Sequence, residues 1–404
     1  MLFNFNAIYI IDLFLIGIIA LIILLVFLRR MFSYPYHLLY RKRKNLYTSI
    51  INNLNSLYSR DDKYEGSYRT GKKILDIKSH VNRIAFEEVI TKKINSAANP
   101  SEREFFIKAY ENSGIIDWRI RQLKYSGIWK RRISADKLGK SYSDKAIACL
   151  TLALRDEDED VRLIAVRALG KLKVESAIEY ILSLIKDFSD IRCPNITDIL
   201  IDYGEKAVPY IEKILGNCDS KTCYWILRAL SEMDLKTPSD PGLAAIYISL
   251  EETLRNLISN KDEGVRAYSL IPLAKLFKIR KSAIREIGTA EELNSLKELE
   301  MISGFLNDKS EIVRINAVTA ISIIPDYRAS NYLLNALSDD CWEVNYKASR
   351  LLIKLFFKYR NEEVKKEVAR NLSHPKNIVR KRCREILENI KLIEDYGLDH
   401  NEYI

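Results

Sequence analysis

The sequence predicts an all-α protein in which an N-terminal transmembrane helix is followed by an α-solenoid of helical hairpins. Helix-breaking residues are scarce, since the 404 residues include only 14 Gly and 9 Pro. An apolar run lies near the N-terminus, and beyond it one sequence pattern returns about every 31 residues. A period of this length is typical of repeat proteins that stack one helical hairpin on the next.

The composition is that of a folded protein. Hydrophobic residues make up 48% and charged residues 29%, which excludes collagen-like, mucin-like and wholly disordered chains. The chain is longer than one compact core usually organises, so it must form several domains or a stacked array. Its six cysteines show no paired spacing of the CxxC type, and we expect a reducing compartment rather than a secreted disulfide framework.

The predicted membrane anchor covers residues 1–30. Residues 7–28 read AIYIIDLFLIGIIALIILLVFL, and a helix of that length, at about 1.5 Å per residue, spans the hydrocarbon layer of a bilayer. No basic segment precedes the run and no small-residue cleavage site follows it, which favours an uncleaved anchor over a signal peptide. Asp12 is the ionisable residue within the run. We expect its side chain to reach the membrane interface, the alternative being a polar partner inside the membrane.

Basic residues predict the orientation of this anchor. No Lys or Arg precedes the run, whereas a basic cluster follows it, made up of Arg29, Arg30, Arg41, Lys42, Arg43 and Lys44. Because positive charge favours the cytoplasmic side, we expect the N-terminus outside the cell and the solenoid in the cytoplasm. Two interpretations of the cluster stay open: it binds anionic lipid headgroups, or it determines topology alone.

The repeat is clearest around Arg162, whose position we call the slot. Its segment, LRDEDEDVRLIAVRALGKLKVESAIEYILSLIKD, contains an acidic turn, a Val-Arg pair, a helix of small and apolar residues, a Gly and a second apolar helix. The slots along the chain are Arg131, Arg162, Arg192, Cys223, Arg266, Arg314, Asn345 and Arg380. An aliphatic residue follows each slot by seven positions, and Val or Ile precedes six of them, which places these residues on one helix face.

A second helix is predicted to return beside each slot helix, as over residues 177–185, 207–215 and 329–337. One hairpin cannot bury its apolar stripes alone, so neighbouring hairpins must stack.

Acidic residues predict how the slot arginines are used. Three acids stand six positions before a slot, at Asp156, Asp308 and Asp339, where we expect them to cap the slot helix. We also expect a structural ladder of Arg-to-Asp contacts between adjacent repeats, in preference to a ligand-binding role. Cys223 and Asn345 depart from the pattern and would interrupt the ladder.

This pattern resembles HEAT repeats, in particular the short variety of about 30 residues found in the phycobilisome-lyase group and in many prokaryotic proteins. The resemblance covers residues 128–392 in about eight units. The first unit differs in having Lys130 in place of the usual Val.

The remaining chain is divided around the repeat. Residues 31–127 are expected to form a basic juxtamembrane segment and a helical cap, with an exposed loop over 59–71. Residues 236–242 and 277–292 lengthen two connections, and residues 393–404 form an acidic tail.

Residue types with metal-binding or catalytic chemistry do not form recognisable motifs. The four His residues stand far apart and none is followed by Glu, unlike the His-Glu pairs of HEAT-repeat di-iron hydroxylases. Cys218 and Cys223 lack a second pair at zinc-ligand spacing, and we interpret them as small apolar or surface residues. The sequence contains no phosphate-binding glycine loop and no GxSxG motif. We therefore expect no cofactor, no metal and no enzymatic activity.

The resemblance implies a scaffold or adaptor for a protein partner, and the anchor suggests a membrane-associated one, such as a polysaccharide glycosyltransferase. We expect the partner surface to include a basic cluster at Arg380, Lys381, Arg382 and Arg384. The alternative is a nucleic-acid-binding protein similar to the alkylpurine DNA glycosylases, with Trp225 and Trp342 on its surface. The net charge of +10 is weak support for that alternative, because six of the charges lie beside the membrane. A bilin lyase is less favoured, since a bilayer anchor is unexpected for a soluble bilin-attaching subunit.

Overall fold

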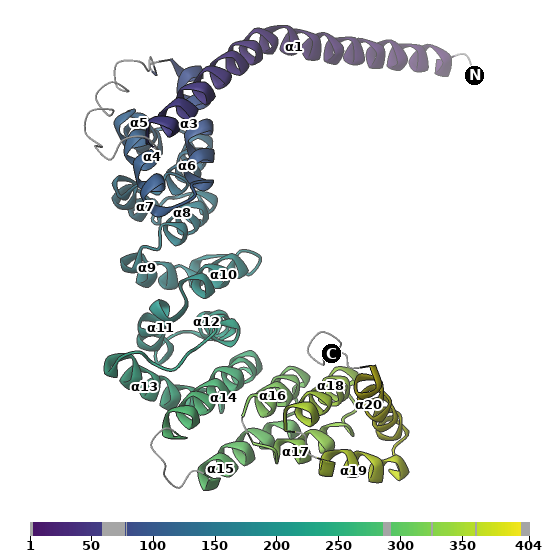
Figure 1. Ribbon diagram of the computed structural model, residues 1–404. Coiled ribbons are helices and arrows are strands. Elements are labelled where there is room, and N and C mark those ends of the chain that lie inside the picture. The colour runs from purple at the N-terminus through teal and green to yellow at the C-terminus, as the bar shows by residue number, and fades with distance from the viewer. Residues whose placement is uncertain are drawn as a thin grey trace. The chain divides into compact units, whose positions relative to one another are not determined.

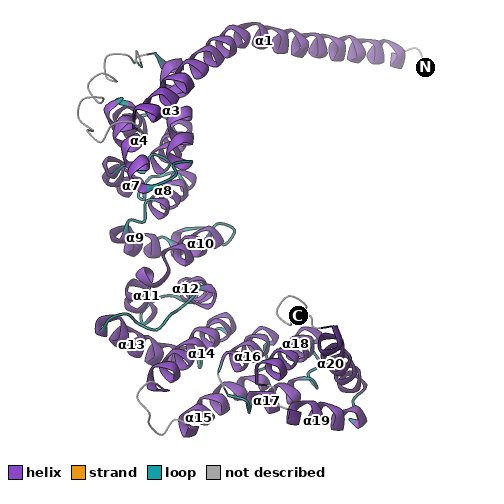
Figure 2. Ribbon diagram, in the orientation of Figure 1, coloured by secondary structure: helices purple, strands orange, loops and turns teal. Residues whose placement is uncertain are grey.

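The computed structural model describes residues 3–58, 77, 79–285, 292–324, 326–359 and 362–396, and helices dominate these ranges (Figure 1). No strand occurs in the described part of the chain, as the colouring of Figure 2 shows. Within the helices, the side chains of residues 3–13, 29–33, 54–58, 283–285 and 292–295 lie outside the description. The chain divides into two compact units, Met1–Leu172 and Lys173–Ile404.

Unit 1 joins a long N-terminal helix to a series of packed helices. These are α1 (Phe3–Tyr58), α3 (His80–Asn95), α4 (Pro100–Asn112), α5 (Ile115–Tyr125), α6 (Ile128–Gly139), α7 (Ile147–Ala153) and α8 (Glu159–Lys171). Helix α1 packs on α3, α5 packs on α6, and α6 packs on α8. Paired helices therefore begin before residue 128, where the sequence pattern places the first repeat.

Unit 2 continues as two layers of helices. They are α9 (Ile178–Ser183), α10 (Cys193–Tyr203), α11 (Val208–Leu215), α12 (Ser220–Glu232), α13 (Pro241–Leu257), α14 (Glu263–Arg285), α15 (Glu292–Ser303), α16 (Glu311–Ile323), α17 (Ala329–Ala336), α18 (Trp342–Tyr359), α19 (Glu362–Arg370) and α20 (Asn377–Tyr396). The even-numbered helices each contact the next even-numbered helix, and α9, α11 and α13 form a second layer, as do α17 and α19. The three predicted return helices are confirmed as α9, α11 and α17.

The slot helices bury the apolar stripe that the sequence predicts. In α16 the slot residue is Arg314. Val313 lies one position before it, Ala317 and Ile321 lie three and seven positions after it, and all three are 0% exposed. Full burial of a Val or Ile side chain contributes roughly 1.5–3 kcal/mol. Helix α16 packs against the slot helices α14 and α18, so stacking of the hairpins buries this stripe.

Helix α1 has two parts with different surroundings. Its C-terminal part packs on α3, where Tyr47 and Ile51 are buried and the ring of Tyr47 lies edge-on to Phe86 at 5.5 Å. Lys44 also forms an ion pair with Glu88 at 2.5 Å. Among the described residues, no helical stretch combines the length and the apolar character needed to cross a membrane. Residues 7–13 of the predicted anchor have side chains outside the description.

A buried ionic network joins the helices between α1 and the repeats. Glu87 on α3 accepts hydrogen bonds from the Tyr110 hydroxyl at 2.7 Å and from Arg119 Nε at 2.9 Å, and a second Arg119 nitrogen binds its other oxygen. Glu87 and Arg119 are 1% and 5% exposed. The charges compensate each other and the carboxylate is hydrogen-bonded, which is the condition for burying such a pair. The network therefore fixes α3, α4 and α5 as one cap.

One predicted connection is helical instead. Helix α14 continues to Arg285, so the segment beginning at residue 277 is not a loop over its first nine residues. Arg280 on this extension forms ion pairs with Glu251 of α13 and Glu298 of α15. These pairs explain why the helix extends, because they hold its last turns between two neighbours. The predicted loop at 59–71, residues 286–291 of the predicted connection and residues 397–404 of the predicted tail lie outside the described residues. Residues 393–396 of that tail belong to α20.

Close packing of α6 on α8 provides a test of this arrangement. A Cβ atom on Gly139 would lie 2.5 Å from Cβ and 2.7 Å from Cα of Ala168. We expect Gly139→Ala to lower the free energy of unfolding of the full chain by about 1–3 kcal/mol, because the two backbones must separate. The matched control is Gly127→Ala, where nothing lies within 4 Å and φ is −63°. Equal stability of the two variants, measured by thermal unfolding, would contradict the close contact.

Candidate functional site

The slot arginines bind the turn that precedes their own helix. Arg266 Nη1 donates to the carbonyls of Asn260 and Lys261, six and five positions earlier, at 2.9 Å each. The same pair of bonds, over 2.7–3.3 Å, is made by Arg162, Arg314 and Arg380. Arg131 binds the carbonyl five positions earlier, on Ser126. Each guanidinium thereby pins the turn between the return helix and the slot helix.

Three slot arginines also contact an aspartate of the next repeat. The pairs are Arg131 with Asp156, Arg266 with Asp308, and Arg314 with Asp339. The N–O distances lie between 2.8 and 3.1 Å, and the side chains are only 11–16% exposed. The last two pairs are bidentate, the geometry that suits a guanidinium and a carboxylate best.

The sequence contains the signal for these pairs, namely an Asp six positions before the following slot. The steps before Cys223, Arg266 and Arg380 have Asn217, Asn260 and His374 at that position. None of these three is an acid, so the predicted ladder consists of separate contacts rather than one continuous series.

The expected caps lie two residues further along the chain. At α8 the cap is the residue four positions before the slot, since Asp158 accepts from the Val161 N–H at 3.0 Å. Asp219 and Asp262 do the same at α12 and α14. At α16 the residue in that position, Ser310, makes no side-chain cap hydrogen bond. Asp156 instead accepts from the Asp158 N–H and from Arg131. It therefore shapes the turn and links two repeats, rather than capping the helix.

One predicted slot and one interpretation need correction. Arg192 is the N-cap of α10 and its neighbour Ile191 is 89% exposed, so both lie one residue out of register. Cys193 Sγ donates to the Phe188 carbonyl five positions earlier at 4.0 Å, which places Cys193 in the slot. Cys223 forms a disulfide with Cys218, so the interpretation of these two cysteines as separate small residues is wrong.

The last departure from the pattern, Asn345, connects the slot to another helix. Its Nδ2 donates to the Asp339 carbonyl six positions earlier at 3.1 Å, as a slot arginine would. Its Oδ1 accepts from Arg382 Nε of α20 at 2.9 Å. Asn345 thus pins its own turn and positions an arginine of the following hairpin.

The four residues of the predicted partner cluster differ in exposure on α20. Lys381 and Arg384 are exposed, whereas Arg382 is 5% exposed and Arg380 binds its own turn. In the basic cluster near the predicted membrane, Arg41 and Lys42 are exposed, while the side chains of Arg29 and Arg30 lie outside the description.

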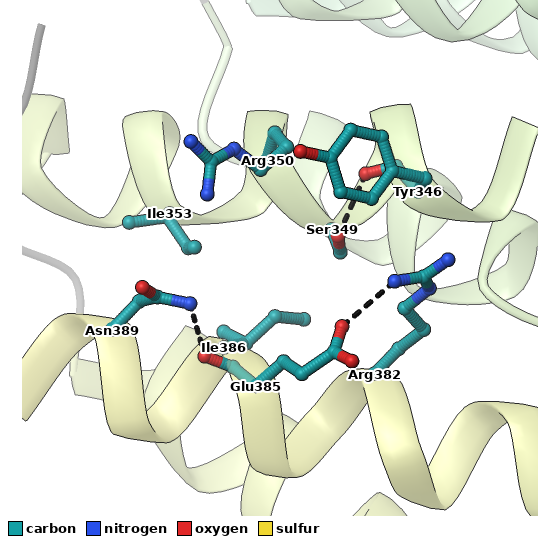
Figure 3. A pocket seen from close by; sticks show the side chains of 8 residues that line it. All are labelled: Tyr346, Ser349, Arg350, Ile353, Arg382, Glu385, Ile386 and Asn389. Atoms are coloured by element: carbon teal, nitrogen blue, oxygen red, sulfur yellow. Dashed lines mark hydrogen bonds and ion pairs between the residues drawn. The ribbon is translucent and has the colours of Figure 1, made fainter. Parts of the chain in front are cut away.

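Arg382 faces a groove between α18 and α20 (Figure 3). The groove is lined by Tyr346, Ser349, Arg350, Ile353, Arg382, Glu385, Ile386 and Asn389. Arg382 Nη1 donates to Glu385 at 2.7 Å, so its guanidinium is held by Asn345 on one side and by Glu385 on the other.

Aromatic rings extend this groove along α18. Trp342 and Tyr346 are stacked, with ring centroids 4.9 Å apart and planes inclined by 8°. The Arg382 guanidinium lies 5.1 Å from the Tyr346 ring and 5.8 Å from the Trp342 ring. Trp342 is nevertheless 62% exposed, whereas Trp225 is 8% exposed and belongs to the core. The spacing of Trp342, Tyr346 and Arg350 by four residues each is the sequence signal for this row.

The dimensions of the groove limit what it can bind. Its volume is about 210 Å³, below the roughly 300–1,000 Å³ of sites for small molecules and cofactors. Two arginines and one glutamate leave one positive charge in excess. The groove can therefore hold a few side chains of a partner, including an acidic one. Within the described ranges, no group of three or more His, Cys, Asp or Glu residues is placed to hold a metal ion.

Comparison with known proteins supports a helical-repeat fold. The family described as HEAT repeats matches residues 116–192, and no curated protein matches the chain. Among solved structures, an engineered protein is 18% identical over 82% of this chain and 97% of its own, with a TM-score of 0.37. The complex of CpcE and CpcF of phycocyanin lyase from Nostoc sp. PCC7120 is 15% identical over 68% and 94%, with a TM-score of 0.31. Kap121p is 13% identical over 82% of this chain and 44% of its own, with a TM-score of 0.35. TM-scores this low carry no argument about function.

A matched pair of variants tests the contact between repeats. Arg314 and Arg380 both bind two carbonyls of their own turn, but within the described residues only Arg314 also pairs with an acid. We expect Arg314→Ala to lower the free energy of unfolding by about 1.5–3 kcal/mol more than Arg380→Ala, because Asp339 loses a charged hydrogen-bond donor. Thermal unfolding followed by circular dichroism measures both. Equal losses would show that the contact contributes nothing.

The pH dependence of stability tests the Arg266–Asp308 contact. Burial raises the pKa of Asp308, but hydrogen bonds from Arg266 and from the Ser310 N–H outweigh it, so the pKa lies below its ordinary value. The ionised Asp308 should therefore make the unmodified protein more stable than Asp308→Asn. This difference in free energy of unfolding should be fully present above the unfolded-state pKa of about 3.9, and it should disappear as the pH falls through the lowered folded-state pKa. The difference in unfolding midpoint between the two proteins, measured from pH 7 to pH 3, checks this. A difference that already shrinks between pH 7 and pH 5 would contradict the lowered pKa.

Proposed function

We propose that this chain is a membrane-anchored, cytoplasm-facing helical-repeat scaffold that binds a protein partner in the groove between α18 and α20. The observation that carries the proposal is the exposed, stacked Trp342 beside the buried Arg382. Trp, Tyr and Arg dominate the binding energy of protein interfaces. Arg382 is already held by Asn345 and Glu385, so binding costs it little conformational freedom.

The groove favours an extended segment that carries an acidic side chain next to an apolar one. The exposed rings of Trp342 and Tyr346 offer apolar contact, and Arg350 and Arg382 offer charge-assisted hydrogen bonds. The exposed Lys381 and Arg384 on α20 add positive charge outside the groove. An acidic partner surface would therefore approach this part of unit 2 favourably.

Exposure along α1 supports the membrane anchor. The apolar side chains between Phe14 and Phe27 are 40–71% exposed, and nearly every position in this range has one. A helix that is apolar on all sides and is not covered by protein is stable in lipid rather than in water. The basic residues from Arg29 to Lys44 support a cytoplasmic orientation of the repeats and a contact with anionic headgroups.

Tethering raises the effective concentration of the scaffold near other membrane proteins. A membrane-associated protein is therefore our candidate partner, and the resemblance to anchored HEAT-repeat proteins suggests an enzyme such as a polysaccharide glycosyltransferase. We propose no catalytic activity for the chain itself, on the ground that the sequence contains no recognised catalytic motif.

The groove is tested by cross-linking followed by a measurement of affinity. A photoreactive amino acid in place of Tyr346 should cross-link one protein in native membranes, and the same amino acid in place of Tyr180, 43% exposed on α9, should not. With that protein purified, Trp342→Ala and Arg350→Glu should each raise the dissociation constant by roughly 30-fold or more. Tyr180→Ala and Lys213→Glu are the matched controls and should leave it unchanged.

Unfolding midpoints of the four variants establish that they are folded. Equal affinities of the groove variants and the controls would refute the groove as the binding site. Cross-linking of nucleic acid at Tyr346 would favour the nucleic-acid-binding alternative instead.

The anchor is tested by charge insertion into α1. We expect Ile18→Lys combined with Ile22→Lys to release the full chain from membranes at alkaline pH, because each Lys near the centre of a span costs about 2.5–3.5 kcal/mol. The control carries Leu38→Lys and Leu39→Lys, which replace residues with similar exposure beyond the apolar run. Retention of both variants, or release of both, would contradict a span over residues 7–28.

A further inference from the structure

One hairpin uses a disulfide where five others use an arginine. Cys223 occupies the slot of α12, and Cys218 lies five positions earlier in the turn between α11 and α12. Arginines in five other slots bind the carbonyl at this same position, five residues earlier. The disulfide therefore pins the turn at the point where the other hairpins are pinned by a hydrogen bond.

The pinned turn positions several contacts of α12. Asp219, next to Cys218, caps the helix at the Thr222 N–H. Lys221 Nζ donates to the Phe188 carbonyl of the preceding hairpin at 2.5 Å. On the other side, the Tyr224 ring packs edge-on against Tyr268 of α14 at 5.1 Å. The first turn of α12 thus contacts both neighbouring hairpins.

The slot Arg-to-Asp contact is not available beside α12. The residues six positions before the slots at Cys223 and Arg266 are Asn217 and Asn260. An ion pair of 3.6 Å between Lys221 and Asp190 links α12 to the preceding hairpin instead. Opening of the disulfide removes the covalent constraint on this turn and leaves the Asp219 cap and the Lys221 contacts.

We propose that Cys218 and Cys223 form a reversible redox site, in which oxidation by a low-molecular-weight disulfide locks the turn before α12 and reduction releases it. The biological setting rests on the proposed cytoplasmic orientation. In the cytoplasm, thiols are kept reduced and the disulfides that form there are usually transient, catalytic or redox-sensing.

The reaction is a thiol–disulfide exchange with oxidised glutathione as the oxidant. The Cys218 thiolate, which is the more exposed of the two, attacks one glutathione sulfur, forms a mixed disulfide and releases one glutathione thiolate. The Cys223 thiolate then attacks Cys218 Sγ and releases the second. The protein loses two protons and two electrons, and the glutathione disulfide gains them as two thiols.

Three of the other four cysteines provide internal controls. Cys149, Cys193 and Cys383 are buried and form no disulfide, whereas Cys341 is half-buried and is not used as a control. Burial raises the pKa of Cys149, and raises that of Cys383 to about 11, which makes both thiols poor nucleophiles near neutral pH. Exchange with glutathione should therefore be confined to Cys218 and Cys223 among these five residues.

The test uses the purified full chain in detergent micelles. Samples are equilibrated with mixtures of reduced and oxidised glutathione, quenched with acid, alkylated and analysed by peptide mass spectrometry. Hydrogen exchange of residues 216–224 is then compared between the two forms. We expect reversible interconversion, and amide exchange at least about tenfold faster in the reduced form.

Two double variants distinguish a local effect of the disulfide on this turn from a general loss of stability. Cys218→Ser with Cys223→Ser should exchange like the reduced protein at every glutathione ratio. Cys218→Ser with Cys223→Arg should restore slow exchange that no longer responds to glutathione, because it recreates the arginine of the other slots. Equal exchange in the oxidised and reduced forms, or a disulfide that glutathione cannot open in the folded protein, would overturn the redox site.

Trapping the redox state of Cys218 and Cys223 in cells distinguishes this inference from the proposed function. In acid-quenched host cells we expect mainly thiols, with the disulfide increasing after treatment with diamide. A complete disulfide in unstressed cells, combined with reversible exchange in the purified protein, would support the redox chemistry and refute the cytoplasmic orientation.

Discussion

The turn inside each hairpin is the constraint on which the stack depends, because its carbonyl groups lie beyond the return helix and before the slot helix. A half-buried carbonyl without a donor costs about 1–3 kcal/mol. Arg266 supplies that donor to two successive carbonyls, and so fixes where the return helix ends and where the slot helix begins. The register of the apolar stripe follows from that starting point. Since stacking buries the stripe, a turn pinned at the wrong residue would turn apolar side chains toward water.

The slot residue makes different contacts in different hairpins of unit 2. At α14 and α16 the slot arginine also binds an aspartate of the next repeat, which links three slot helices through two successive contacts. At α12 a covalent bond replaces the arginine. At α18 the shorter Asn345 pins the turn and leaves an oxygen that binds Arg382. The groove that we propose for the partner therefore lies where an Asn-to-Arg hydrogen bond replaces the Arg-to-Asp contact between repeats.

Much of this fold could be predicted from the sequence, because periodicity determines which residues share a helix face. The stripe of Val313, Ala317 and Ile321, the return helices and the Arg-to-Asp contacts depend on spacing alone. The path of a turn depends on individual hydrogen bonds and disulfides, which the spacing of residue types does not specify. For this reason the caps were placed two residues early, Arg192 was assigned to a slot held by Cys193, and the Cys218–Cys223 pairing was missed. Trp342 at the start of α18 and Trp225 within α12 both fit a helical pattern, and only packing distinguishes the exposed ring from the buried one.

The most direct test of this account is native-state hydrogen exchange of the full chain carrying Arg266→Leu, which keeps apolar volume at the slot but removes every donor. If the slot residue pins its own turn, amides of residues 260–266 should exchange at least about tenfold faster than in the unmodified protein, while those of residues 339–345 keep their rates. Unchanged exchange at residues 260–266 would contradict the account. A uniform increase across unit 2 would also contradict it, since it would show that Arg266 contributes general stability rather than a local constraint.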